Sequence, residues 1–71
     1  MTQKFGLTQP QQQALDHIKA HQAEYGVSPS MREMATDMGI QVSSVHRRVA
    51  ALEQRGHIAR LPHISRSIVL L

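Results

Sequence analysis

The chain has 71 residues and no cysteine, so it is long enough for one small domain that packing alone must hold together, without disulfides or thiolate metal sites. So small a core leaves little room for a deep walled pocket, and no catalytic pattern of side chains is present, so we expect a binding module with no enzymatic activity and no cofactor. No apolar run approaches the roughly 20 residues of a membrane span, and the polar start lacks a signal peptide's apolar stretch, so we expect a cytoplasmic protein with no membrane partner.

The formal charge of +3 is distributed unevenly. Residues 1–40 carry three basic and four acidic side chains, whereas residues 41–71 carry five arginines against Glu53 alone. Arginine presents a planar fork of donors suited to phosphate and guanine. The second half is therefore the part expected to face an anionic partner.

The first helix is expected to begin after Thr8, with Pro10 in its first turn, and to run to about Tyr25 before Gly26 ends it. At helical spacing its thin apolar stripe comprises Ala14, Leu15 and Ile18, with Tyr25 two turns further on.

Two histidines on this helix, His17 and His21, are one turn apart and have the spacing of a metal-binding pair. Zinc needs three or four protein ligands, and no third ligand follows at a suitable spacing. We therefore expect solvent-facing histidines and no metal.

The second helix is predicted over residues 31–38, where Ser30 and Glu33 have the spacing of a capping box and Gly39 supplies the left-handed position that ends the helix. A third helix follows after a short turn, over residues 43–55, with Ser43 or Ser44 as its cap. Its buried stripe should be Val45, Val49 and Leu52, and its opposite face Ser43, Arg47, Ala50 and Gln54.

Beyond Gly56, the segments HIARL and SIVLL are rich in strand-forming residues, and the loop PHISR (62–66) between them predicts a hairpin. Two helices joined by a short glycine-containing turn form a helix-turn-helix. The predicted fold is mainly α with a small β-hairpin: a single domain over residues 1–71, with a winged helix-turn-helix made of three helices and a two-stranded wing.

In order and spacing, these segments resemble the N-terminal DNA-binding domain of LexA repressors. LTQPQQQALDHIKAHQAEYG is similar to that family's first helix, VSPSMREMATDMGI to its second, and RGHIARLPHISRSIVLL to its Gly-x-Ile strand, Ser-Arg wing loop and Leu-Leu finish. The resemblance implies a winged fold that binds double-stranded DNA as a transcriptional regulator. We expect this regulator to be a repressor. The chain departs from the family at VSSVHRRVAALEQRG, where LexA proteins tend to have a longer turn with Pro and Asn followed by acidic residues. The self-cleaving dimerisation domain of LexA has no counterpart in these 71 residues, so self-cleavage is not implied.

The candidate DNA contacts fall in three groups. The start of a recognition helix approaches base edges, a helix N-terminus favours a phosphate, and a basic wing follows the backbone or enters the minor groove. The candidates are Gln41, Ser43, Ser44, His46, Arg47 and Arg48 on the third helix, Ser30 and Arg32 on the second, and His63 and Arg66 in the wing, with Arg60 a weaker one.

Each candidate also has a structural interpretation. The serines can be plain helix caps, Arg48 can pair with an acid on another helix, and PHISR can be only a turn. For the whole chain the alternative to DNA binding is a winged-helix adaptor that binds another regulator or polymerase. A homodimer, formed in solution or only on DNA, is a further expectation, since one such module buries too little surface for useful specificity.

Overall fold

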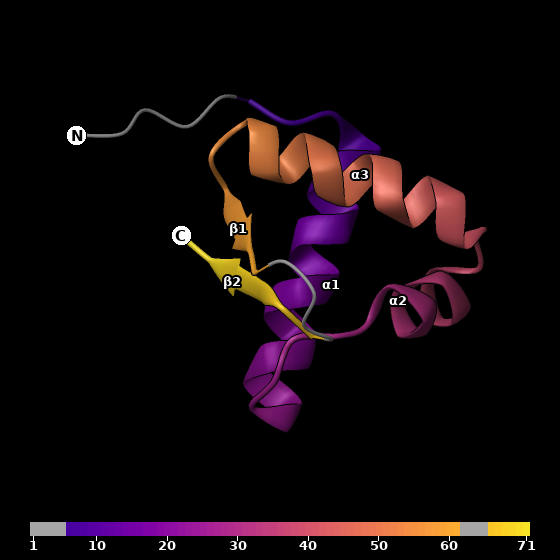
Figure 1. Cartoon of the computed structure of the whole chain (residues 1–71). Coiled ribbons are helices and arrows are strands. Elements are labelled where there is room, and N and C mark those ends of the chain that lie inside the picture. The colour runs from indigo at the N-terminus through magenta and orange to yellow at the C-terminus, as the bar shows by residue number, and fades with distance from the viewer. Residues whose placement is uncertain (1–5, 62–65) are drawn as a thin grey trace.

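The computed structural model describes residues 6–61 and 66–71. Three helices are followed by an antiparallel pair of strands: α1 (Gln9–Tyr25), α2 (Met31–Met38), α3 (Val42–Gln54), β1 (Ile58–Arg60) and β2 (Ile68–Leu70). Figure 1 shows α3 lying across the N-terminal half of α1, with α2 at the start of α3 and the strands near its end. The predicted winged helix-turn-helix is confirmed. We call β1, β2 and the segment between them the wing.

Local signals set the first two helices as predicted. Each begins with a reciprocal capping box, Thr8 with Gln11 in α1 and Ser30 with Glu33 in α2, and each ends at a glycine in the left-handed conformation. At the end of α2, Gly39 has φ 67° and the Ile40 amide donates to the Ala35 carbonyl at 3.1 Å. This closed end turns the chain within three residues into α3, which is the geometry of a helix-turn-helix.

The third helix begins differently from the prediction. Its N-cap is Gln41, whose side chain makes no capping hydrogen bond, and the helix covers residues 42–54 rather than 43–55. Ser43 and Ser44 lie inside the first turn, so the expectation that either serine caps α3 was wrong. Neither hydroxyl is therefore used as a cap of α3.

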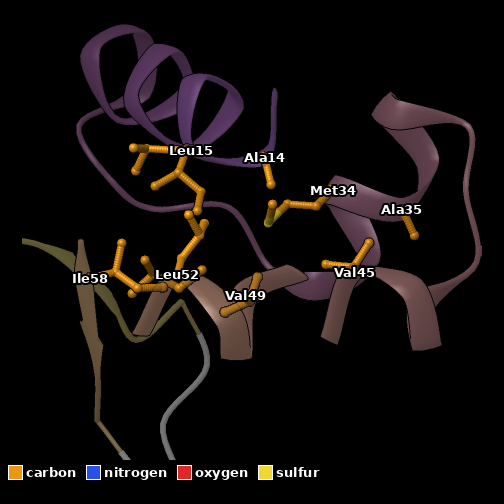
Figure 2. Close-up of a cluster of buried hydrophobic side chains, with 10 residues drawn as sticks. Ala14, Leu15, Met34, Ala35, Val45, Val49, Leu52 and Ile58 are labelled. Atoms are coloured by element: carbon orange, nitrogen blue, oxygen red, sulfur yellow. The ribbon is translucent and has the colours of Figure 1, made fainter. Parts of the chain in front are cut away.

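One core joins all five elements (Figure 2). The stripe Val45, Val49 and Leu52 of α3 is completely buried, as predicted, and packs on residues of α1, α2 and both strands. The full cluster comprises Ala14, Leu15, Ile18, Met34, Ala35, Val45, Val49, Leu52, Ile58 and Ile68. Tyr25 is not part of it: its exposed fraction is 63%, because α1 extends past the core before it ends. The inclusion of Tyr25 in the buried stripe was therefore wrong.

The strands are shorter than the predicted segments, at three residues each, with Ala59 opposite Val69 in the register. Backbone hydrogen bonds extend the pairing one step at each end, from the Leu61 amide to the Ser67 carbonyl and from the Leu71 amide to the His57 carbonyl. Within the described residues, no helix is both long and apolar enough to cross a membrane.

Candidate nucleic-acid interface

The outward face of α3 is a polar stripe parallel to the buried one. Ser43, Arg47, Ala50 and Gln54 are all exposed and recur every three or four residues, on the side of the helix away from Val45 and Val49. At its centre is the small side chain of Ala50, so another surface can approach the helix backbone closely there. Neither Ala50 nor Gln54 was named as a contact candidate, although the helical spacing had placed both on this face.

Polar groups are concentrated at the N-terminal end of this stripe. The Ser43 hydroxyl donates to Gln41 Oε1 at 3.5 Å, and Arg47 Nη2 donates to the Ser44 hydroxyl at 3.2 Å. His46 is exposed beside them. These weak, exposed contacts keep the side chains close together without burying their donors.

Arg48 lies one residue further toward the core and is half-buried. It lines a shallow hollow together with Arg47 and Ser44 of α3 and with Thr8 and Gln11 at the start of α1. Among the described residues it has no ion pair, so the alternative in which Arg48 pairs with an acid on another helix is not observed. Its positive charge is available at the junction of α1 and α3.

At the start of α2 the capping interpretation of Ser30 is confirmed. The Ser30 hydroxyl accepts from the Glu33 amide at 3.0 Å, and the Ser30 amide donates to Glu33 Oε1 at 2.9 Å. Two of the free donors of this helix end are therefore occupied by its own residues. The Arg32 side chain, by contrast, is exposed and makes no hydrogen bond or ion pair with the described part of the chain.

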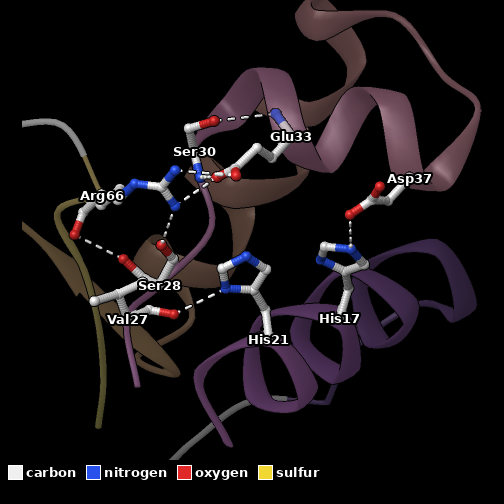
Figure 3. Close-up of polar contacts among 8 residues, drawn as sticks. All are labelled: His17, His21, Val27, Ser28, Ser30, Glu33, Asp37 and Arg66. Atoms are coloured by element: carbon white, nitrogen blue, oxygen red, sulfur yellow. Dashed lines mark hydrogen bonds and ion pairs between the residues drawn. The ribbon is translucent and has the colours of Figure 1, made fainter. Parts of the chain in front are cut away.

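Of the wing loop, residues 62–66, the structure describes Arg66. The candidate His63 lies outside the described residues. The Arg66 guanidinium is bound to the domain itself (Figure 3): Nη1 lies 2.6 Å from Glu33 Oε1, and Nη2 donates to Oε2 at 3.0 Å. The Arg66 hydrogen bond and the Ser30 amide lower the pKa of the Glu33 carboxyl to about 2. Arg60 is paired as well, with its Nε 3.5 Å from Glu53 Oε1. The capping role of Glu33 was predicted from the sequence, whereas its pairing with Arg66 was not.

The two histidines of α1 were expected to face solvent, but each contacts another part of the domain. His17 Nε2 lies 3.2 Å from Asp37 Oδ2 of α2, and His21 Nδ1 donates to the Val27 carbonyl at 2.8 Å (Figure 3). Both rings thus help to join α1 to the segment that follows it. No group of three potential metal ligands occurs within residues 6–61 and 66–71.

Comparison with known proteins identifies one family over nearly the whole chain. The family model described as LexA DNA binding domain matches residues 4–67. The LexA repressor of Thermosipho melanesiensis is 43% identical over 65 residues, which cover 92% of this chain and 33% of the relative. That of Cereibacter sphaeroides (strain ATCC 17023) is 41% identical over 66 residues, covering 92% and 29%. The chain thus spans about a third of the length of these curated relatives.

Proposed function

This chain belongs to the LexA DNA-binding domain family, and from that premise we propose that it binds double-stranded DNA in a sequence-specific manner, as the operator-reading part of a transcriptional repressor. The observation that carries the proposal is the exposed polar stripe of α3 with Ala50 at its centre. A major groove about 12 Å wide admits one α-helix, and a small residue at the point of closest approach lets the helix seat deeply.

In this arrangement the N-terminal half of α3 reads the bases. Arg47 is suited to guanine, and Gln41 to adenine, through paired hydrogen bonds. The hydroxyls of Ser43 and Ser44 and the ring of His46 extend the same polar surface. These residues lie where the start of a recognition helix meets base edges.

Phosphate contacts then fix the orientation of the domain. Arg48 lies at the junction of α1 and α3, and Arg32 with Ser30 lies at the start of α2. Contacts of this kind position a protein on DNA without reading its sequence. His63 remains the expected contact of the wing, whereas the Arg66 guanidinium is already paired with Glu33.

The test of the proposed function is selection of bound duplexes from a random library at low salt. One enriched motif is expected, and its symmetry reports how many copies bind. Absence of any enriched motif would overturn DNA reading and favour the adaptor alternative.

The variant Arg47→Ala tests the role of α3. We expect it to cost about 1–3 kcal/mol of binding to the selected duplex and to relax the preference at one or two positions, because a lost base contact acts mainly on the specific complex. Titration of selected and scrambled duplexes at one fixed salt concentration measures both effects.

Lys19→Ala is the matched control, since it removes one exposed positive charge from α1 rather than from α3. It should change affinity for both duplexes little and leave the base preference unchanged. An Arg47→Ala loss that is equal on the two duplexes would assign Arg47 to the phosphate backbone instead.

A further inference from the structure

Arg66 is the described residue of the wing loop, and four contacts fix it to the start of α2 and to the segment just before it. Besides the two Glu33 contacts, Arg66 Nη1 donates to the Ser28 carbonyl at 3.2 Å, and the Ser28 hydroxyl donates back to the Arg66 carbonyl at 2.7 Å (Figure 3). Ser28 is buried, with an exposed fraction of 5%. Residues 38 positions apart in sequence therefore bind one another reciprocally, through side chain and backbone.

The backbone of Arg66 is also unusual. Its φ is 53°, the left-handed conformation that residues with a side chain rarely adopt, and it is the only non-glycine residue with positive φ in the described part of the chain. Such a conformation persists where the surrounding contacts hold it. Here those contacts are with Ser28 and Glu33, so they determine where the chain enters β2.

The Glu33 carboxylate takes part in both the capping box of α2 and the ion pair with Arg66. Glu33 Oε1 accepts from the Ser30 amide, which closes the capping box of α2, and both oxygens face the Arg66 guanidinium. The start of α2, proposed above as a phosphate contact, and the base of the wing are therefore linked by one side chain. We call Ser28, Ser30, Glu33 and Arg66 the wing clasp.

We infer that the wing clasp positions the wing for DNA, and that Arg66 acts through Glu33 and Ser28 rather than by contacting a phosphate itself. A guanidinium held by two carboxylate oxygens and a carbonyl has most of its donors occupied before DNA arrives. Breaking the clasp leaves the wing in its binding-competent orientation only part of the time. The apparent affinity for DNA is then the intrinsic affinity multiplied by that fraction of the time. This inference rests on the proposed function.

The test compares Glu33→Gln, Arg66→Gln and the double variant on the selected duplex. Glutamine at position 33 retains the capping box, since α1 of this chain closes its own box with Gln11 in the equivalent place. We expect each single variant to bind about tenfold more weakly, as a competent fraction of one tenth requires, and the double variant to bind no more weakly than either single one.

Direct phosphate contact predicts the opposite sign for Glu33→Gln. Removing an acid and freeing Arg66 would then tighten binding, and Arg66→Gln would lower the salt slope of affinity by about one unit. A positioning role leaves that slope unchanged. Tighter binding by Glu33→Gln, a lower slope for Arg66→Gln, or additive losses would each overturn the inference.

Two further variants sharpen the comparison. Arg66→Lys keeps the charge but not the planar fork, so it should bind as weakly as Arg66→Gln, whereas a phosphate contact would be largely restored by lysine. Glu53→Gln removes the same charge from the other Arg–Glu pair and should bind as well as the unmodified chain or better. Urea unfolding of each variant establishes that it is folded.

A measurement on the unmodified chain separates this inference from the proposed function. The guanidinium NMR signals of Arg66 should be protected from exchange in the free protein and stay in place when the duplex is added. Signals that move on DNA binding would overturn the clasp even if every variant failed to fold. No DNA binding by the unmodified chain would overturn the proposed function, while protected Arg66 signals would still support the pair.

Discussion

The arginines of residues 41–71 differ in whether an acidic side chain of the domain pairs with them. Arg60 and Arg66 each face a glutamate of the domain itself, whereas Arg47 and Arg48 have no acidic partner within the described residues. Arg55, at the end of α3, has no ion pair among these residues either, and its Nε is buried. The positive charge of residues 41–71 that no acid pairs with therefore lies along α3, at Arg47, Arg48 and Arg55. Counting charges along the sequence located the basic half, and only the contacts separate unpaired charges from those paired within the domain.

The Glu33 pair predicts a pH dependence of stability. The pKa of Glu33 falls from its usual 4.5 to about 2 in the folded domain. Its contribution to the free energy of unfolding is then fully present above pH 4.5 and is lost as the pH falls toward 2, because the unfolded state takes up the proton first. Urea midpoints of the unmodified chain and of Glu33→Gln, measured from pH 7 to pH 2, should differ by a constant amount above pH 5 and converge below it.

The difference between the two proteins isolates this carboxyl, since the other acids titrate in both. Arg66→Gln serves as the matched control: without its guanidinium, the main cause of the lowered pKa is gone, and most of the acid dependence should go with it. A gap that stayed constant down to pH 2 would mean that Glu33 titrates normally in the folded state and that the pair is weak.

At the scale of single elements, the caps differ in a way that stability measurements can detect. Ser30 makes the side-chain cap of α2, whereas Ser43 and Ser44 lie in the first turn of α3, after an N-cap that has no side-chain hydrogen bond. Ser30→Ala should therefore cost about 1 kcal/mol in the free energy of unfolding, and Ser43→Ala less than about 0.5 kcal/mol. Gln41→Ser should stabilise the domain by about 0.5–1 kcal/mol, because it supplies the missing cap.

Denaturant unfolding of the three variants at one pH tests this order. Thr8→Ala, which removes the equivalent cap of α1, is the positive control and should resemble Ser30→Ala. Equal losses for Ser30→Ala and Ser43→Ala would show that Ser43 does cap α3 in solution.

How far the sequence predicts each element depends on how local its signals are. The bounds of α1 and α2 follow from capping boxes and terminal glycines within a few residues, and they were predicted correctly. The start of α3 was not, because the closed end of α2 at Gly39 and the half-buried Ile40 place the helix start at an extended Gln41 with no capping side chain.

In the candidate site too, the features with local sequence signals were predictable and the long-range contacts were not. Helical spacing correctly gave the exposed stripe of α3 from Ser43 to Gln54. The pairs Arg66–Glu33 and His17–Asp37 join residues 33 and 20 positions apart, and no local pattern encodes them. They arise only when the packing of the core brings α1, α2 and the wing together, so the structural role of Arg66 required the structure.

For the whole molecule, size sets what one copy can do on DNA. The domain measures 33 × 24 × 23 Å, and its long dimension is close to one helical turn of DNA, about 34–36 Å. A copy that binds DNA as proposed, with its long axis along the duplex, would therefore cover one half-site. Its exposed large hydrophobic side chains are divided among the end of α1, the start of α3 and the strands, at Tyr25, Val27, Val42, Leu61, Val69 and Leu71.

We therefore expect the free chain to be monomeric, since a stable dimer buries about 1,200 Å² or more in one continuous interface and these side chains are spread over three parts of the chain. On a duplex with two half-sites one turn apart, two copies of this length come into contact, so the second should bind about tenfold more tightly than the first, or about 1.4 kcal/mol. Sedimentation of the free chain, and titration of duplexes carrying one or two half-sites, measure both quantities.

Inserting about five base pairs between the half-sites is the decisive control, because half a turn places the two copies on opposite sides of the duplex. Each half-site keeps its own sequence, so intrinsic binding is unchanged and only contact between the copies is removed. We expect the tenfold gain to disappear on this duplex and to return when a full turn is restored. A gain that ignored the spacing would not come from contact between the copies, and equal binding on every duplex would mean that the domains act independently and that any dimerisation arises outside these 71 residues.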